Sequence, residues 1–242
     1  MHPLVWLSID AHGGIDRWRR IRQISASFIP SGTLVQHGLA PLAQTVTRIS
    51  VDTREQMAVL EPFLARGQSA CFQPYITSVD SCDGRVLESL ISPRSSFAGM
   101  APGTPWSATQ LAYVVGYAAW MYLTVPFSLM RAGVRCVETD PWEENGELWR
   151  AIKVHFPHTY VMHSREQVIY LDHDGLIRRH DCTVDIAGGA RTAHYAFDHR
   201  DVDGIVFPTR RCIYMRDAFN VPQKDSAVVV ANLSDFEISR FS

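Results

Sequence analysis

The chain has 242 residues and a formal charge of −2, with 46% hydrophobic and 20% charged residues. This length can bury a substantial core, and the composition excludes disordered, collagen-like and fibrous proteins. The near-neutral charge argues against a nucleic-acid-binding protein, which needs a basic surplus or stripe to meet the phosphates. Because the chain contains no linker, low-complexity run or clear internal repeat, we expect a single domain over residues 1–242.

The first ten residues contain a short apolar stretch that no basic region precedes and that Asp10 ends. This pattern predicts no signal peptide. The cysteines are odd in number and lack C-x-x-C spacing, which favours neither a disulfide framework nor a zinc ribbon: Cys71, Cys82, Cys136, Cys182 and Cys212. We therefore expect reduced thiols and a cytoplasmic location.

Residues 95–130 carry no formal charge, and within them the pattern predicts a helix over 105–123. Thr104 is the expected N-cap, and Pro105 would take the first helical position. The apolar core of this helix spans only 111–123 before Thr124 and Pro126, whereas a bilayer helix needs roughly 20 apolar residues. The segment therefore indicates a buried helix of a soluble protein and no transmembrane segment.

The rest of the chain is mostly strand-like. A short helix is expected after Gly13 and Gly14, and Asp83-Gly84 predicts a hairpin. The last third contains consecutive candidate strands with tight turns, over 149–156, 159–172, 176–185, 193–199, 205–214 and 228–236. A helix that is apolar nearly all round must be enclosed. We therefore expect a mainly β fold, in which a single curved antiparallel sheet (an open half-barrel) wraps around a buried apolar helix.

Two-residue turns at Asp174-Gly175 and Gly188-Gly189 would set the register of three strands. They pair Ile169 with His180, Leu171 with Arg178, and Gln167 with Cys182. On the next strand they pair Cys182 with Tyr195, His180 with Phe197, and Arg178 with His199. The resulting apolar face carries a half-buried polar set of Arg178, His180, Tyr195 and His199.

The following strand adds one arginine to this set. A three-residue loop over 202–204 would place Arg211 opposite Tyr195, whereas a two-residue turn at Asp203-Gly204 would select Arg210. Both remain open, because a one-residue slip moves every side chain to the other face.

The predicted helix presents an aromatic stripe at helical spacing: Tyr113, Gly116, Tyr117, Trp120 and Thr124. These residues are either ordinary core or the wall of an apolar cavity with Phe127 near its mouth. In the second interpretation Gly116 forms a dent, and Gly116→Leu would block ligand binding while leaving folding nearly intact.

The chain resembles a group of bacterial proteins of the lipoprotein-carrier (LolA/LppX-like) type over residues 11–236. The segments that carry the resemblance are AHGGIDRW (11–18), GYAAWMYLTVPF (116–127), PWE (141–143), HSREQ (163–167), DGLIRRHD (174–181) and FPTRR (207–211). The resemblance implies an open antiparallel half-barrel with helices on its concave side around a hydrophobic cavity.

Histidines are frequent in the second half, but no His-Glu-x-x-His motif exists, so we expect no metal site. Motifs for nucleophiles, phosphate loops and dinucleotides are also absent, and no cofactor is expected. The favoured hypothesis is an enzyme without a cofactor, of cyclase, isomerase or dehydratase type, acting on a lipophilic small molecule. His180, His199 and Tyr195 would supply acid–base groups, and Arg178 and Arg211 would stabilise an anion.

Two other functions remain open. A non-catalytic carrier or sequestering protein for an acyl chain needs the same cavity and one polar anchor. A structural interaction module would need only the core. The oligomeric state is not predicted.

Overall fold

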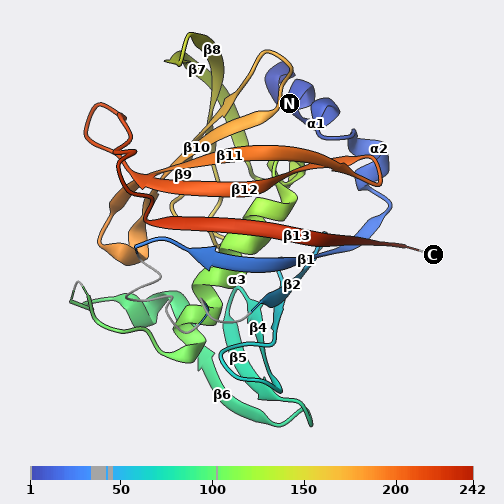
Figure 1. Cartoon of the computed structure of the whole chain (residues 1–242), viewed down its shortest axis with the longest axis vertical. Helices are drawn as coiled ribbons and strands as arrows, with labels where there is room; N and C mark the ends of the chain where they lie inside the picture. Colours follow the sequence, from blue (N-terminus) through green and yellow to red (C-terminus); the bar gives the residue numbers. More distant parts are fainter. Residues whose placement is uncertain (1, 34–41, 43–45, 102, 242) are drawn as a thin grey trace.

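The computed structural model describes residues 2–33, 42, 46–101 and 103–241 (Figure 1). Its first six strands are β1 (Ile21–Ser31), β2 (Thr47–Asp52), β3 (Ala58–Glu61), β4 (Gln68–Gln73), β5 (Ile76–Ser81) and β6 (Val86–Ile91). The others are β7 (Arg135–Glu144), β8 (Glu147–His155), β9 (Glu166–Leu171), β10 (Ile177–Val184), β11 (Ala190–Val202), β12 (Ile205–Met215) and β13 (Val229–Arg240).

These strands form one antiparallel sheet in the order β6-β5-β4-β3-β2-β1-β13-β12-β11-β10-β9-β8-β7. β6 and β7 are its two edges and do not pair with each other, so the sheet is open. The helix α3 (Ala108–Thr124) lies on the concave side and packs against β2 to β6 (Figure 1). The expected fold class, an open half-barrel around an apolar helix, is confirmed.

The helix α3 begins at a capping box. The hydroxyl of Ser107 accepts a hydrogen bond from the backbone N–H of Gln110, and the side chain of Gln110 accepts one from the N–H of Ser107. The expected cap at Thr104 is therefore wrong, and the helix starts three residues later than predicted. It ends before Pro126, as expected. Among the described residues, no helix is both long and apolar enough to cross a membrane.

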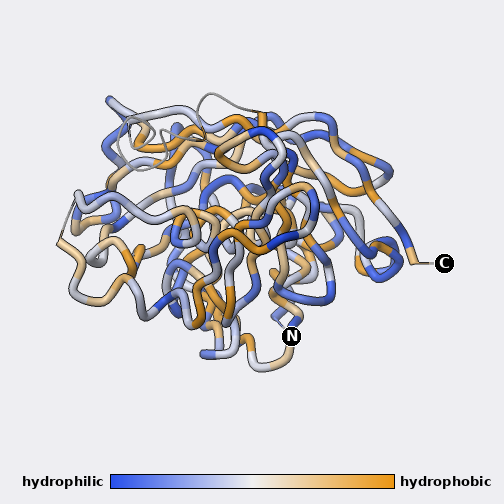
Figure 2. Tube along the Cα trace, turned by 90° about the horizontal axis from the view of Figure 1, so that it is seen from below, coloured by the Kyte–Doolittle hydropathy of each residue, from blue (hydrophilic) through white to orange (hydrophobic). Residues whose placement is uncertain are grey.

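Two helices precede the sheet: α1 (Pro3–Ala11) and α2 (Ile15–Trp18). The second confirms the expected short helix, whereas α1 was not predicted. The apolar stretch at the start of the chain folds as this helix and buries Leu4, Val5 and Ile9 in the core. Figure 2 shows the hydropathy alternation of the strands, with long hydrophobic stretches toward the middle of the molecule.

The described residues also form three short 3-10 helices: η3 (Pro93–Phe97), η4 (Phe127–Met130) and η5 (Asp185–Ala187). The last of these corrects a predicted register, because β10 and β11 are joined by a five-residue loop over 185–189 and not by a two-residue turn. His180 therefore pairs with His194, and Cys182 pairs with Thr192. The shift from the expected pairing is three residues, an odd number, so β11 turns its other face toward the core.

The neighbouring registers are closer to expectation. His180 pairs with Ile169 and Cys182 with Gln167, as predicted. Arg178 does not pair with Leu171, because a bulge between Ile177 and Arg179 displaces it.

The β11–β12 turn is the two-residue Asp203-Gly204 alternative. It places Arg210 opposite Phe197 and Arg211 opposite Ala196. Because β11 is itself turned over, Arg211 is the arginine that faces the core.

Gly116 is not a dent in a cavity wall. A Cβ atom on this residue would lie 2.3 Å from the Cβ of Phe72 on β4. Glycine is needed here because the backbone of α3 approaches the sheet too closely for any side chain. The expectation that Gly116→Leu would leave folding intact is therefore wrong.

We expect Gly116→Ala to lower the free energy of unfolding by about 1–3 kcal/mol, the usual range for overpacking. Helix propensity alone would stabilise this variant by up to about 1 kcal/mol. Urea unfolding followed by circular dichroism measures the difference, and equal or greater stability in the variant would contradict the close approach of α3 to Phe72.

Candidate functional site

Buried polar side chains gather on the inner face of β10 to β12, between the sheet and the helices. We call the following six the inner cluster, each at most 6% exposed: His12, His163, His180, Cys182, His194 and Arg211. They come from the end of α1, the loop before β9, and the strands β10, β11 and β12. This concentration of buried titratable groups marks the region as the candidate site.

Hydrogen bonds join α3 to the inner cluster. The hydroxyl of Tyr122 lies 2.7 Å from Nδ1 of His194, and the hydroxyl of Tyr117 lies 3.0 Å from Nδ1 of His163. His180 bonds through Nε2 to the side-chain oxygen of Gln167. The sheet and α3 are thus joined by polar contacts as well as by apolar packing.

Arg211 is a buried cation without a nearby anion. No carboxylate of the described residues lies within ion-pair distance of its guanidinium group. The group lies 4.5 Å from the ring of Tyr122 and donates to the carbonyl oxygen of that residue at 3.4 Å. Its strand neighbours Ala196 and Ala231 leave room for it. Burial lowers the pKa of Arg211 to about 10, so the group remains charged at neutral pH.

The imidazoles of the inner cluster are neutral at pH 7. Burial lowers the pKa of His12 to about 4, that of His163 to about 4 and that of His180 to about 3. Burial also places the pKa of His194 well below its ordinary value, and Arg211 contributes to the effect on His180 and His194. Neutral imidazoles can accept protons or bind metals, whereas the thiol of Cys182 stays protonated because burial raises its pKa to about 12.

Tyr195 lies on the opposite face of the sheet and not in the predicted site. There it belongs to an outer cluster of Trp142, Glu144, Trp149, Tyr170, Arg179, Asp181 and Tyr195. Arg179 is fully buried and donates two hydrogen bonds to Asp181 at 2.7 and 2.8 Å. The hydroxyl of Tyr195 donates to Glu144 at 2.8 Å. The charges of the outer cluster are thus paired.

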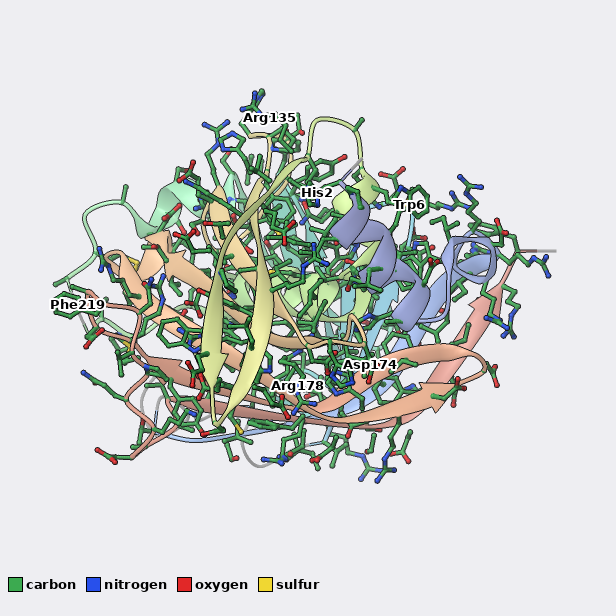
Figure 3. All side chains as sticks on the ribbon, turned by 90° about the horizontal axis from the view of Figure 1, so that it is seen from above. His2, Trp6, Arg135, Asp174, Arg178 and Phe219 are labelled. Carbon is green, nitrogen blue, oxygen red and sulfur yellow. The ribbon has the colours of Figure 1, made fainter. Side chains whose placement is uncertain are left out.

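The other two predicted site residues lie apart. His199 donates through Nε2 to the carbonyl oxygen of Ile177, and its ring lies 6.3 Å from that of His12 at the border of the inner cluster. Arg178 is one-third exposed, 3.9 Å from the carboxylate of Asp172, and Figure 3 shows it beside the turn that contains Asp174. The structure therefore brings His180 and Arg211 into one buried region but leaves Arg178 at the surface.

The aromatic stripe of α3 belongs to the packed core. Tyr113, Tyr117 and Trp120 are all 0% exposed, and Phe72 packs edge-on against both tyrosines. The indole N–H of Trp120 donates to the carbonyl oxygens of Asp52 and Glu55 at 2.9 Å. These three residues line neither the open pocket of about 310 Å³ nor that of about 430 Å³, and their role as a cavity wall stays a prediction.

Phe127 does line a pocket. Its ring stacks on that of Trp18 with the centroids 4.2 Å apart, and the two rings form one wall of an open pocket of about 310 Å³. The pocket lies where α2, the β2–β3 loop and the C-terminal end of α3 meet. Its other lining residues are Ile15, Arg19, Thr53, Arg54, Thr124, Ser128, Met130 and Arg131. We call it the Trp18 pocket.

Several residues of the inner cluster were missed from the sequence. His12 belongs to a segment that was interpreted as a glycine turn, and His163 was placed inside the predicted strand 159–172, whereas it lies in the loop before β9. His194 was assigned to the outer face by the register error at the β10–β11 loop. The only signal in the sequence was the abundance of histidine in the second half of the chain.

No protein-family model matches the chain, and no curated protein matches it. Several solved structures are similar to it. A LolA superfamily protein from Nitrosomonas europaea is 11% identical with a TM-score of 0.55, over 98% of this chain and 93% of that chain. A DUF1329 family protein from Desulfovibrio piger is 9% identical, also with a TM-score of 0.55, over 98% and 92% of the two chains.

A third likeness is to a domain from Vibrio parahaemolyticus described as an outer membrane lipoprotein-sorting protein. It is 11% identical with a TM-score of 0.55, over 97% of this chain and 92% of that chain. The chain therefore has the open half-barrel fold of LolA-like proteins. At these identities the likeness establishes the fold.

We expect acid to destabilise the protein well above the range in which carboxylates titrate. The unfolded histidines bind protons below about pH 6.5, but the buried ones do so only near their folded pKa values of about 3 to 4. The contribution of these histidines to the free energy of unfolding is therefore fully present above about pH 6.5. It is lost as the pH falls toward 4, by about 1.4 kcal/mol per pH unit for each such histidine.

Urea unfolding at several values of pH from 7.5 to 5 measures this slope. His12→Gln should reduce the slope by one histidine's share, whereas His173→Gln, at an exposed position, should leave it unchanged. An unchanged slope in His12→Gln would contradict the burial of a neutral imidazole.

Two arginine–aspartate pairs of equal length test the outer cluster. The buried Arg179–Asp181 pair and the exposed Arg210–Asp198 pair both have N–O distances of 2.7 Å. We expect Arg179→Gln to cost about 3–5 kcal/mol, because it leaves buried Asp181 with only Arg216, at 3.6 Å, as a charged partner, and Arg210→Gln to cost at most about 1 kcal/mol. Chemical unfolding measures the free energy of unfolding of both variants. A similar loss in the two would contradict the burial of the Arg179–Asp181 pair.

Proposed function

We propose that the protein is a carrier or sequestering protein for an amphiphilic ligand with an apolar body and an anionic end. The observation that carries this proposal is the Trp18 pocket, where a stacked aromatic pair adjoins three arginines. The fold is consistent with the proposal, since one of the similar structures is described as a lipoprotein-sorting domain.

The apolar part of the pocket suits a hydrocarbon chain or ring. The rings of Trp18 and Phe127 stack on each other and line the pocket, together with Ile15 and Met130. A volume of about 310 Å³ is at the lower end of the range for small-molecule sites. An occupant would thus place part of its apolar surface there.

The polar part of the pocket suits an anion. Among the described residues, neither Arg54 nor Arg131 forms an ion pair with a carboxylate, and Arg19 has only an exposed contact of 3.8 Å with Asp16. The guanidinium of Arg131 is held in place by the carbonyl oxygens of Thr53 and Arg54. Arginine binds carboxylates and phosphates with two parallel hydrogen bonds.

Two hydroxyl groups add to this polar part. The side chains of Thr124 and Ser128 line the pocket, and their buried oxygens have no hydrogen-bond partner among the described residues.

A fluorescent long-chain fatty acid tests the proposal. We expect it to bind in one equivalent, and Arg54→Gln to weaken its binding about tenfold, the cost of about 1.4 kcal/mol for one charged hydrogen bond. Arg54 is exposed, so folding should be preserved. Arg85→Gln, which removes an exposed arginine outside the pocket, is the matched control. A long-chain alcohol should bind both variants equally.

Absence of binding by any of these probes to the folded protein would overturn the proposed function. If Arg54→Gln bound the fatty acid as tightly as the wild type does, Arg54 would not belong to the binding site. Mass spectrometry of an organic extract of the purified protein identifies the natural ligand directly.

The second candidate function is an enzyme without a cofactor, of cyclase, isomerase or dehydratase type. One observation favours it: the uncompensated cation of Arg211 lies among the neutral imidazoles of the inner cluster. The cation could stabilise an enolate-like oxygen, and His180 or His199 could accept a proton. Tyr195 lies on the opposite face of the sheet and Arg178 is one-third exposed beside Asp172, so neither belongs to the inner cluster.

The fate of a bound ligand separates the two functions. A carrier releases the extracted ligand with unchanged mass and unchanged nuclear magnetic resonance spectrum after incubation. An enzyme converts it, and His180→Ala, His199→Ala or Arg211→Lys should then reduce turnover, by at least ~100-fold for the histidines. Conversion that persists in all three variants would exclude this site as the catalytic one.

A further inference from the structure

Three side chains of the inner cluster point their ligating atoms toward one another. His163, Cys182 and His194 each offer one atom, and these atoms all lie within 4.8 Å of one another. The distance between Sγ of Cys182 and Nε2 of His194 is 3.4 Å. All three residues are buried, and they come from the loop before β9, from β10 and from β11.

The hydrogen bonds of the two imidazoles leave Nε2 of each directed into this group. Nδ1 of His163 bonds to the hydroxyl of Tyr117, and Nδ1 of His194 bonds to that of Tyr122. Metal binding through Nε2 requires the tautomer with a proton on Nδ1, and in that tautomer each Nδ1–H donates to its tyrosine oxygen. Metal-binding histidines are commonly oriented by a hydrogen bond of this kind.

A second observation points to a missing ligand. Nε2 of His163 is buried and has no hydrogen-bond partner among the described residues. An unsatisfied buried polar atom is destabilising, so its presence at this position needs an explanation. By contrast, Nε2 of His194 and Sγ of Cys182 also contact the hydroxyl of Thr192, at 2.9 and 3.3 Å.

We propose that His163, Cys182 and His194 bind a thiophilic d¹⁰ metal ion, Zn²⁺ or Cu⁺, on the inner face of the sheet. On binding, the ion displaces the thiol proton of Cys182 to solvent. The resulting thiolate with two imidazoles suits these ions, whereas Mg²⁺ and Ca²⁺ prefer oxygen ligands. The bound ion satisfies the free nitrogen of His163. It connects β10, β11 and the loop before β9, and through the two tyrosines it fixes α3 against them.

The metal site is independent of the proposed carrier function, since none of its three residues lines the Trp18 pocket. Failure of metal binding would therefore leave the ligand assay unaffected, and the reverse also holds.

Metal titration of the reduced, chelator-treated protein tests the proposal. We expect one equivalent of Zn²⁺ or Cu⁺ to bind in competition with a chromophoric chelator for that ion. The two ions are titrated separately, and the titration in which the protein competes with the chelator identifies the ion. One equivalent of Co²⁺ should give thiolate-to-cobalt charge-transfer absorption. Cys182→Ser should abolish this absorption and weaken binding at least ~100-fold, and Tyr122→Phe should weaken binding about tenfold.

The matched controls are Cys212→Ser and His180→Gln. Cys212 is another buried thiol but follows Arg211 on β12 and faces the other side of the sheet, near Arg210. His180 is a buried imidazole of the same cluster whose Nε2 is occupied by Gln167. Both variants should bind metal as the wild type does.

Circular dichroism confirms that each variant is folded. The proposal is overturned if the folded wild type binds neither Zn²⁺ nor Cu⁺, or if Cys182→Ser binds with unchanged affinity. Loss of binding in Cys212→Ser as great as in Cys182→Ser would also overturn it, because the thiolate would then be misassigned.

Discussion

The whole architecture depends on burying α3, a helix that is apolar on nearly every side. One face of a flat sheet cannot cover such a helix, so the sheet curves around it and remains open at β6 and β7. At Gly116 the absence of a side chain lets the helix backbone approach Phe72 closely. The hydroxyls of Tyr117 and Tyr122 on the same helix lie within hydrogen-bond distance of His163, in the loop before β9, and of His194 on β11.

Buried charges are paired on the outer face of β10 and β11 but not on the inner face. On the outer face, Arg179 is paired with Asp181 and lies 3.6 Å from Glu144, so the charges largely compensate one another. On the inner face, Arg211 has no carboxylate partner among the described residues, and Nε2 of His163 is unsatisfied. Buried groups of this kind are costly, and proteins retain them mainly where a ligand or ion uses them. The charges of the outer cluster are thus compensated within the protein, and the inner cluster is the candidate site.

The fold and the candidate site differ in how far the sequence predicts them. The antiparallel meander and the apolar helix follow from local patterns, because turns, charges and apolar runs are neighbours in the chain. The site depends on which side chains share a face across strands, and that depends on loop length. One loop of five residues in place of two, at 185–189, moved Tyr195 out of the site and His194 into it.

The sequence by itself determined the fold class, the position of α3 to within three residues, and the pairing of His180 with Ile169. These depend on periodicity and on tight turns, which act over short distances. Only the tertiary structure decided that Gly116 serves close packing, that Phe127 stacks on Trp18, and that His163, Cys182 and His194 meet. Those contacts join segments that are distant in the chain, and their geometry is set by how the curved sheet closes around α3.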